Sequence, residues 1–154
     1  MKDKVMDRRR LLLSAALGMT SLGILPRAFA QRALPAVTVY KNEGCGCCGD
    51  WEKHMRAAGF RVESHSLADV TTMKRKLGVP DALRSCHTAT VEGYVLEGHV
   101  PADDVKRLLR ERTSTRGLAV PGMPIGSPGM EQGPPQPYST LAFDASGSRV
   151  FARH

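Results

Sequence analysis

The sequence lacks three features that would point to a membrane protein, a repeat protein or a nucleic-acid-binding protein. The apolar run that follows Arg10 is interrupted by Gly18 and Gly23 and is too short for a convincing membrane span. No internal repeat is visible. Aromatic residues make up only 5% of the chain, and no basic patch with interleaved aromatic side chains is present. We therefore expect neither a stable membrane span in the mature protein nor a nucleic-acid partner.

Residues 1–30 have the pattern of a signal peptide. A charged start with arginines at positions 8–10 precedes the apolar run, and an Ala-x-Ala sequence ends at residue 30, just before Gln31. The arginines fit a Sec signal and a twin-arginine signal equally well. Either route predicts cleavage and a mature chain of residues 31–154 in the bacterial periplasm. An uncleaved anchor is the alternative.

Removal of this leader changes the charge and the length of the chain. Residues 1–30 hold six of the 22 basic residues and two of the 15 acidic ones. The mature chain keeps 16 basic and 13 acidic residues, so its net charge falls from +7 to +3. Taking 30 residues from 154 leaves 124, a length that suits one domain with a single core.

The hydrophobic patterns predict one α/β domain. We expect strands at residues 36–40, 60–65, 85–91 and 94–97, and helices after residue 50, from residue 69 to 77 and from 102 to 110. This order, βαβα–ββα with thiols after the first strand, is the layout of the thioredoxin-like fold. A long Gly/Pro/Met loop at residues 117–139 and a C-terminal β-hairpin follow it. A loop of this length inside a small domain is usually functional or disordered.

Three of the four cysteines crowd into the turn between the first strand and the first helix, in the sequence Cys45-Gly46-Cys47-Cys48. Backbone N–H groups and the positive end of a helix dipole favour thiolate there, which is both the nucleophile and the metal ligand. Cys45 and Cys48 form a C-x-x-C pair, which is typical of thiol–disulfide exchange. Cys47 would invite wrong disulfides in such an enzyme, but a third thiol suits soft Cu(I).

Four residues outside this turn are further candidate ligands. Cys86 and His87 begin the third predicted strand, and we expect them beside the cysteine turn. The alternatives are a small buried apolar role for Cys86, and an outer hydrogen-bonding role or simple solvation for His87. Met123 and Met130 lie on no periodic apolar face, so they either supply thioether ligands or pack the loop onto the domain. No metal role is expected for His54, His65, His99 or His154.

Four sequence motifs occur in order along the mature chain. They are Val39-Tyr40-Lys41 leading to Cys45-Gly46-Cys47-Cys48, then Cys86-His87-Thr88-Ala89, then Gly98-His99-Val100-Pro101, and then residues 122–131, Gly-Met-Pro-Ile-Gly-Ser-Pro-Gly-Met-Glu. This combination resembles the CopG-like family of exported bacterial proteins. The resemblance implies a thioredoxin-like fold, copper binding and a link to copper resistance. It points to the four cysteines as thiolate ligands, and it marks His87, Met123 and Met130 as matching positions.

Three functions remain open at this point. The first is a copper protein that sequesters Cu(I), or passes it to other periplasmic copper-handling proteins, with one ion or several per chain and with or without a redox role. The second is an enzyme, a periplasmic thiol–disulfide oxidoreductase that uses Cys45 and Cys48. The third is an iron–sulfur carrier, whose usual ligand spacings differ from those of this chain. Cys47 and the loop methionines favour copper.

Overall fold

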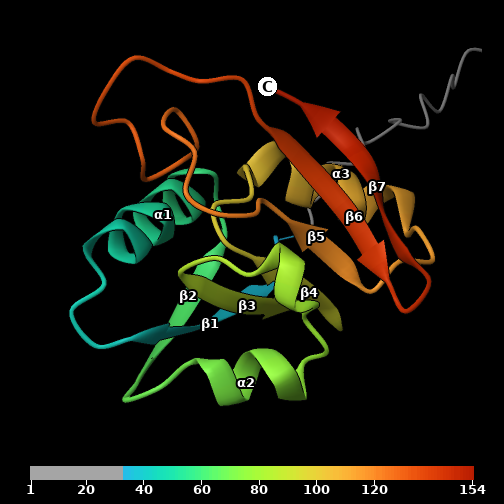
Figure 1. The fold of residues 1–154 in the computed structure, drawn as a ribbon, viewed down its shortest axis with the longest axis horizontal. Coiled ribbons are helices and arrows are strands. Elements are labelled where there is room, and N and C mark those ends of the chain that lie inside the picture. The colour runs from blue at the N-terminus through green and yellow to red at the C-terminus, as the bar shows by residue number, and fades with distance from the viewer. Residues whose placement is uncertain (1–32) are drawn as a thin grey trace, which may run out of the picture. The chain divides into compact units, whose positions relative to one another are not determined.

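A seven-stranded mixed sheet with helices packed against it is built by residues 33–154, the part of the chain that the computed structural model describes (Figure 1). The predicted signal peptide at residues 1–30 lies outside the described residues. The strands lie in the order β2-β1-β3-β4-β5-β6-β7. Their bounds are β1 Ala36–Asn42, β2 Arg61–Leu67, β3 His87–Val91, β4 Tyr94–Glu97, β5 Gly117–Ala119, β6 Ser139–Asp144 and β7 Gly147–Arg153. The helices are α1 Gly46–Ala57, α2 Thr71–Lys76, the short 3-10 helix η1 Asp81–Leu83, and α3 Ala102–Glu111. Within this range, no helix has the length and apolarity to cross a membrane.

The strand pairings confirm the predicted mixed α/β class. β1 pairs in parallel with β2 after the α1 crossover, and it pairs antiparallel with β3 on its other side. β3 and β4 form the predicted hairpin, whose turn residues Glu92 and Gly93 both have positive φ, 46° and 86°. Two positive φ values are typical of the tight turns that match the twist of a hairpin. β6 and β7 form the predicted C-terminal hairpin.

One strand was not predicted. β5 pairs in parallel with β4 and joins the C-terminal hairpin to the rest of the sheet, although the sequence analysis placed these residues in the long loop. Three residues are too few to show an alternating pattern. Packing requires a glycine at position 117, because a Cβ there would overlap the carbonyl of Val95 on β4.

Helix α1 begins earlier than the apolar spacing predicted. The pattern of Trp51 and Met55 placed the helix after residue 50, whereas it begins at Gly46. The first turn carries no apolar periodicity, so the sequence could not reveal it. Trp51 and Met55 are fully buried against Val37 and Val39 of β1, and the Trp51 indole donates a hydrogen bond to the carbonyl of Val100 at 2.9 Å.

A histidine joins α1 to α3. His54 Nε2 accepts a hydrogen bond from the backbone N–H of Ala102, the first residue of α3, at 3.0 Å. The first N–H groups of a helix have no partner within the helix, so this side chain satisfies one of them. Burial lowers the pKa of His54, which favours the neutral ring that can accept this bond.

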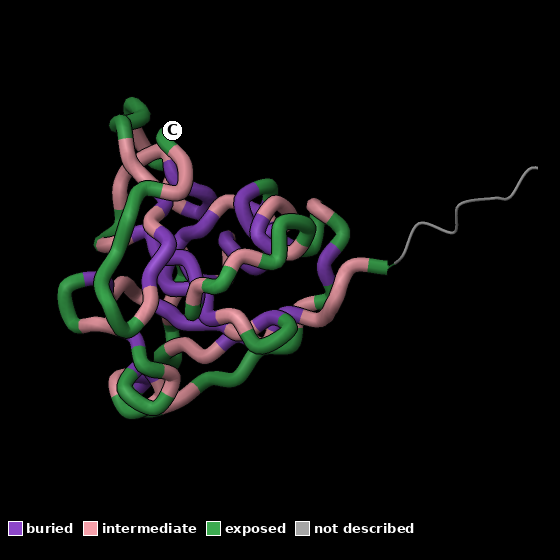
Figure 2. Tube along the Cα trace, turned by 90° about the vertical axis from the view of Figure 1, so that its right-hand side faces the viewer, coloured by how far each residue is buried: buried purple, intermediate pink, exposed green. Residues whose placement is uncertain are grey.

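The loop between β5 and β6, residues 120–138, is called the methionine loop below. It runs from the sheet toward α1, as the orange segment of Figure 1 shows, and Gly129 in this loop packs against the backbone of Cys47 and Trp51. Ser127, Pro128 and Gly129 at its centre are buried. Figure 2 shows buried segments in the interior of the fold and exposed segments at its outer turns. The loop therefore packs onto the domain beside the cysteine turn.

Candidate metal centre

The cysteine turn becomes the first turn of α1. Cys45 is the N-cap residue, with φ −71° and ψ 96°, and Cys47 and Cys48 follow inside the helix. No acidic residue occupies this first turn. The positive end of the helix dipole therefore lies beside these cysteines with no carboxylate in the first turn to offset it.

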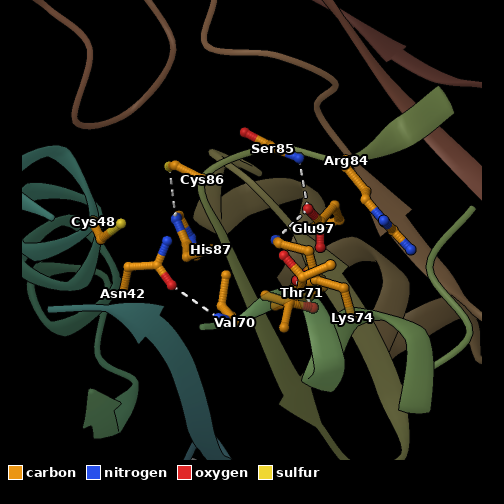
Figure 3. Close-up of polar contacts among 12 residues, drawn as sticks. Asn42, Cys48, Val70, Thr71, Lys74, Arg84, Ser85, Cys86, His87 and Glu97 are labelled. Atoms are coloured by element: carbon orange, nitrogen blue, oxygen red, sulfur yellow. Dashed lines mark hydrogen bonds and ion pairs between the residues drawn. The ribbon is translucent and has the colours of Figure 1, made fainter. Parts of the chain in front are cut away.

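Cys86 brings the fourth thiol against this turn. It lies immediately before β3, and β3 pairs with the end of β1 that leads into the cysteine turn, with Lys41 opposite His87. The Sγ atom of Cys47 lies 3.8 Å from that of Cys86 and 3.7 Å from that of Cys45. All four Sγ atoms lie within 4.8 Å of one another. The structure thus places the four predicted thiols together, with Cys86 and His87 on the side of β3 that faces Cys48 (Figure 3); their role as ligands stays a prediction.

The thiols are divided into two pairs. A disulfide joins Cys45 to Cys48, whereas Cys47 and Cys86 are free. The C-x-x-C pair is thus in its oxidised form. Reduction would give four sulfur donors in one cluster, and such a set of thiols has the chemistry for thiol–disulfide exchange and for binding a soft metal.

His99 belongs to the site, although the sequence analysis gave it no metal role. Its Nε2 lies 2.9 Å from the Sγ of Cys86, and its Nδ1 lies 2.8 Å from the carbonyl oxygen of Pro128 in the methionine loop. The carbonyl can only accept, so Nδ1 carries the proton and Nε2 presents its lone pair toward the thiol. This is the arrangement of a metal-binding histidine, whose other ring nitrogen usually donates to a carbonyl or carboxylate.

His99 could have been assigned to the site from the sequence by extending the predicted hairpin. In the β3–β4 hairpin Val91 faces Tyr94 and Thr88 faces Glu97. Two further steps along this register place Cys86 opposite His99. The Gly98 N–H donates to the His87 carbonyl at 3.0 Å, so the pairing continues past the end of the strands.

His87 lies at the base of the site and is fully buried. Its Nδ1 is 3.3 Å from the Sγ of Cys86, and its ring packs on Trp51 with a centroid distance of 4.5 Å. Its Nε2 has no hydrogen-bond partner among residues 33–154. Burial lowers the pKa of His87 well below its usual value, so the ring is neutral and retains a lone pair for a ligand.

The Cys86 thiol is held in its protonated form by its surroundings. Burial, followed by the nearby Cys47 thiol, raises the pKa of Cys86 to about 12. A bound cation would reverse this preference, because a coordinating thiol is deprotonated outright. Neither group of clustered donors, the four cysteines or Cys86 with His87 and His99, includes a carboxylate. A set of sulfur and imidazole donors fits copper or zinc and does not fit the oxygen-preferring cations.

The two predicted methionines occupy different environments. Met123 is 51% exposed and lies at the surface. Met130 is half-buried and follows Gly129, whose backbone packs against Cys47 and Trp51 in the first turns of α1. The methionine loop therefore lies beside the thiols of the first turn of α1. Thioether ligation by Met123 or Met130 stays a prediction.

Comparisons with known proteins show which proteins this chain is similar to. A family model described as a protein of unknown function, DUF411, matches residues 83–130, which include Cys86, His87, His99 and both methionines. Two solved structures named copper resistance protein CopG, forms 1 and 2, are each 46% identical to this chain, with TM-scores of 0.74 and 0.75. Each match covers 79% of this chain and 98% of the solved one. No curated protein matches the chain.

Proposed function

Because this chain belongs to the CopG-like DUF411 family, we propose that it is a periplasmic protein that binds Cu(I) and acts in copper resistance. The observation that carries the proposal is the approach of four Sγ atoms to within 4.8 Å of one another. Thiolates are the preferred protein ligands of Cu(I). Other periplasmic copper-handling proteins would deliver the metal or receive it.

The proposed ligand set begins with Cys45, Cys47, Cys48 and Cys86. His99 is its nearest imidazole, because its Nε2 lies closer to the Cys86 Sγ than the Nδ1 of His87 does, at 2.9 Å against 3.3 Å. His87, Met123 and Met130 would complete the coordination as neutral donors. Binding of this kind requires the Cys45–Cys48 disulfide to be reduced.

A second function is favoured by one observation, the disulfide between Cys45 and Cys48. A C-x-x-C pair at a helix N-terminus is the usual site of thiol–disulfide exchange. An exchange enzyme needs only this pair, however, and Cys47 lies within 3.8 Å of Cys45 and Cys86 as a competing thiol. The two functions therefore differ in what they require of Cys47.

Replacement of Cys47 separates the two functions. We expect Cys47→Ser to weaken Cu(I) binding, measured by competition with a Cu(I) chelator, because it removes the central sulfur of the cluster. We expect low insulin-reducing activity in both the wild-type protein and this variant. Robust insulin reduction by the wild-type protein, insensitive to the chelator and retained or improved in Cys47→Ser, would favour the enzyme instead.

Export and the fold family are part of the proposal. The charged start and the Ala-x-Ala sequence support removal of residues 1–30, and the order of β1, α1, β2, α2, β3, β4 and α3 supports a thioredoxin-like unit. We expect mass spectrometry of the protein from a periplasmic extract to find a mature N-terminus at Gln31. A cytoplasmic protein that still begins at Met1 would contradict export.

A further inference from the structure

A buried ion pair lies beside the segment that carries Cys86. Lys74 of α2 and Glu97 at the end of β4 are joined at 2.6 Å, with side chains that are 4% and 0% exposed. Burial raises the pKa of Glu97, while the attraction of Lys74 lowers it. Desolvation of such a pair costs about as much as its attraction returns, and well-packed apolar side chains are often as stable. Stability alone therefore does not account for these two charges.

The Glu97 carboxylate binds the residue that precedes Cys86. Its Oε1 accepts hydrogen bonds from the Lys74 Nζ and from the backbone N–H of Ser85, both at 2.6 Å (Figure 3). Its Oε2 has no hydrogen-bond partner within the described part of the chain. The Ser85 hydroxyl donates in turn to the carbonyl of Gly122 in the methionine loop. The oxygen that holds the Ser85 amide is therefore also the oxygen that contacts Lys74.

Glu97 also leads directly to His99. Gly98 between them has φ 70°, and a Cβ there would overlap the side chain of Ser85. The segment 97–99 thus packs on the segment 85–87 without an intervening side chain. Because Cys86 and His99 meet at 2.9 Å across this junction, a shift of one segment would change the separation of these two donors.

We propose that Glu97 and Lys74 are positioning residues for the metal centre. The carboxylate holds the Ser85 amide and so fixes Cys86 opposite Cys47 and His99. Lys74 supplies the buried positive charge that keeps this carboxylate in place between α2 and β4. The copper part of the test rests on the proposed function, whereas the placement of the Cys86 thiol is tested without metal.

Two double variants isolate the contact with Ser85. Lys74→Met with Glu97→Gln removes both charges but keeps a side-chain oxygen that can accept from the Ser85 N–H. Lys74→Met with Glu97→Met removes both charges and the acceptor, at similar volume. Asp104→Asn is the control, because Asp104 is also a buried carboxylate but contacts Thr140 and His154 instead. Each is made in the wild-type chain and in a chain with Cys45→Ser and Cys48→Ser, which keeps Cys47 and Cys86 as its two cysteines.

The first measurement is the rate at which diamide forms the Cys47–Cys86 disulfide in the metal-free two-cysteine chain. Diamide takes up the two electrons and two protons that the thiols lose. We expect the variant with Lys74→Met and Glu97→Met to cross-link about tenfold more slowly than the parent chain. The variant with Lys74→Met and Glu97→Gln should lie between the two, because it keeps the acceptor for the Ser85 N–H but loses the contact with Lys74. Asp104→Asn should stay close to the parent chain. In the four-cysteine chain, we expect the variant with Lys74→Met and Glu97→Met to lose roughly 10- to 100-fold in Cu(I) affinity, as the loss of outer contacts typically does, and the variant with Glu97→Gln to lose less.

Equal cross-linking rates in the two double variants would overturn the proposal, whatever their thermal stabilities. Hydrogen exchange of the wild-type protein tests it without any substitution that could prevent folding. We expect the Ser85 amide to be protected like the amides of β3 and β4, and exchange as fast as in the exposed turns would overturn the proposal. If the wild-type protein binds no copper, the proposed function fails, while the cross-linking and exchange results still decide the placement of Cys86.

Discussion

Anaerobic titration of the fully reduced protein with Cu(I) is expected to saturate above one copper per chain. The four Sγ atoms lie within 4.8 Å of one another, and all four would be ligands in the proposed site. Four thiolates in such a space carry four negative charges, whose mutual repulsion disfavours ionisation unless cations lie between them. One Cu(I) ion offsets only one of these charges.

Thiolates that bridge several Cu(I) ions would offset this repulsion among the four negative charges. Cu(I) needs only two or three ligands, and a thiolate can bridge two ions. Several Cu(I) ions that share Cys45, Cys47, Cys48 and Cys86 would balance the charge better than one ion, and imidazole from His99 or thioether from Met130 would complete the coordination without adding charge. The alternative is one Cu(I) held by two or three thiolates, with the remaining thiol protonated. The raised pKa of Cys86, to about 12 without metal, marks it as the thiol that would stay protonated.

Cys86→Ser therefore separates a shared cluster from a single ion. In a shared cluster Cys86 bridges, so we expect the variant to bind fewer copper ions per chain, measured as copper against protein after removal of excess metal. A thiol count before and after copper removal checks that the Cys45–Cys48 pair was reduced at the start. Saturation at one copper in the wild-type protein, with unchanged affinity in Cys86→Ser, would reject the shared cluster.

The thiol half of this site could be predicted from the sequence because it follows from the order of strands, turn and helix, which local patterns encode. A strand, a turn with three cysteines and a helix fix Cys45, Cys47 and Cys48 at one helix end, and the following strands return Cys86 beside them. The hairpin about Glu92 and Gly93 fixes the register by itself. Extending that register by two residues would also have placed His99.

The positions of Lys74, Glu97 and the methionine loop depend on tertiary packing that no local pattern encodes. Lys74 lies in a six-residue helix rich in polar side chains, and it is buried in contact with Glu97, which comes from another element. The methionine loop has no periodicity, and its position is set by contacts of Pro128 with His99 and of Gly129 with α1. The role of the loop is thus the part of the site that most needs an experiment.

Gly129→Ala is expected to detach the methionine loop from the site. Gly129 has φ 86°, and a Cβ there would lie 2.8 Å from the backbone oxygen of Cys47 and from the backbone nitrogen of Trp51. Both are atoms of α1 that cannot move without distorting the helix. We expect the variant to lose about 2–4 kcal/mol of unfolding free energy in urea, from left-handed strain together with overpacking.

Gly122→Ala is the matched control. Gly122 has φ 69° in the same loop, but a Cβ there would meet no atom within 4 Å. Its cost is therefore the left-handed strain alone, about 1–2 kcal/mol. In the difference between the unfolding free energies of the two variants, the left-handed strain cancels. The remainder measures the clash of the Gly129→Ala methyl group with α1.

The two variants should differ still more in copper binding. In Gly129→Ala the adjacent Pro128 carbonyl, which accepts from His99 Nδ1 at 2.8 Å, is displaced with the loop. Loss of such an outer contact lowers metal affinity roughly 10- to 100-fold. We therefore expect Gly129→Ala to bind Cu(I) that much more weakly in chelator competition, and Gly122→Ala to bind as the wild-type protein does. Equal affinities in the two variants would mean that the loop covers the thiols without orienting a ligand.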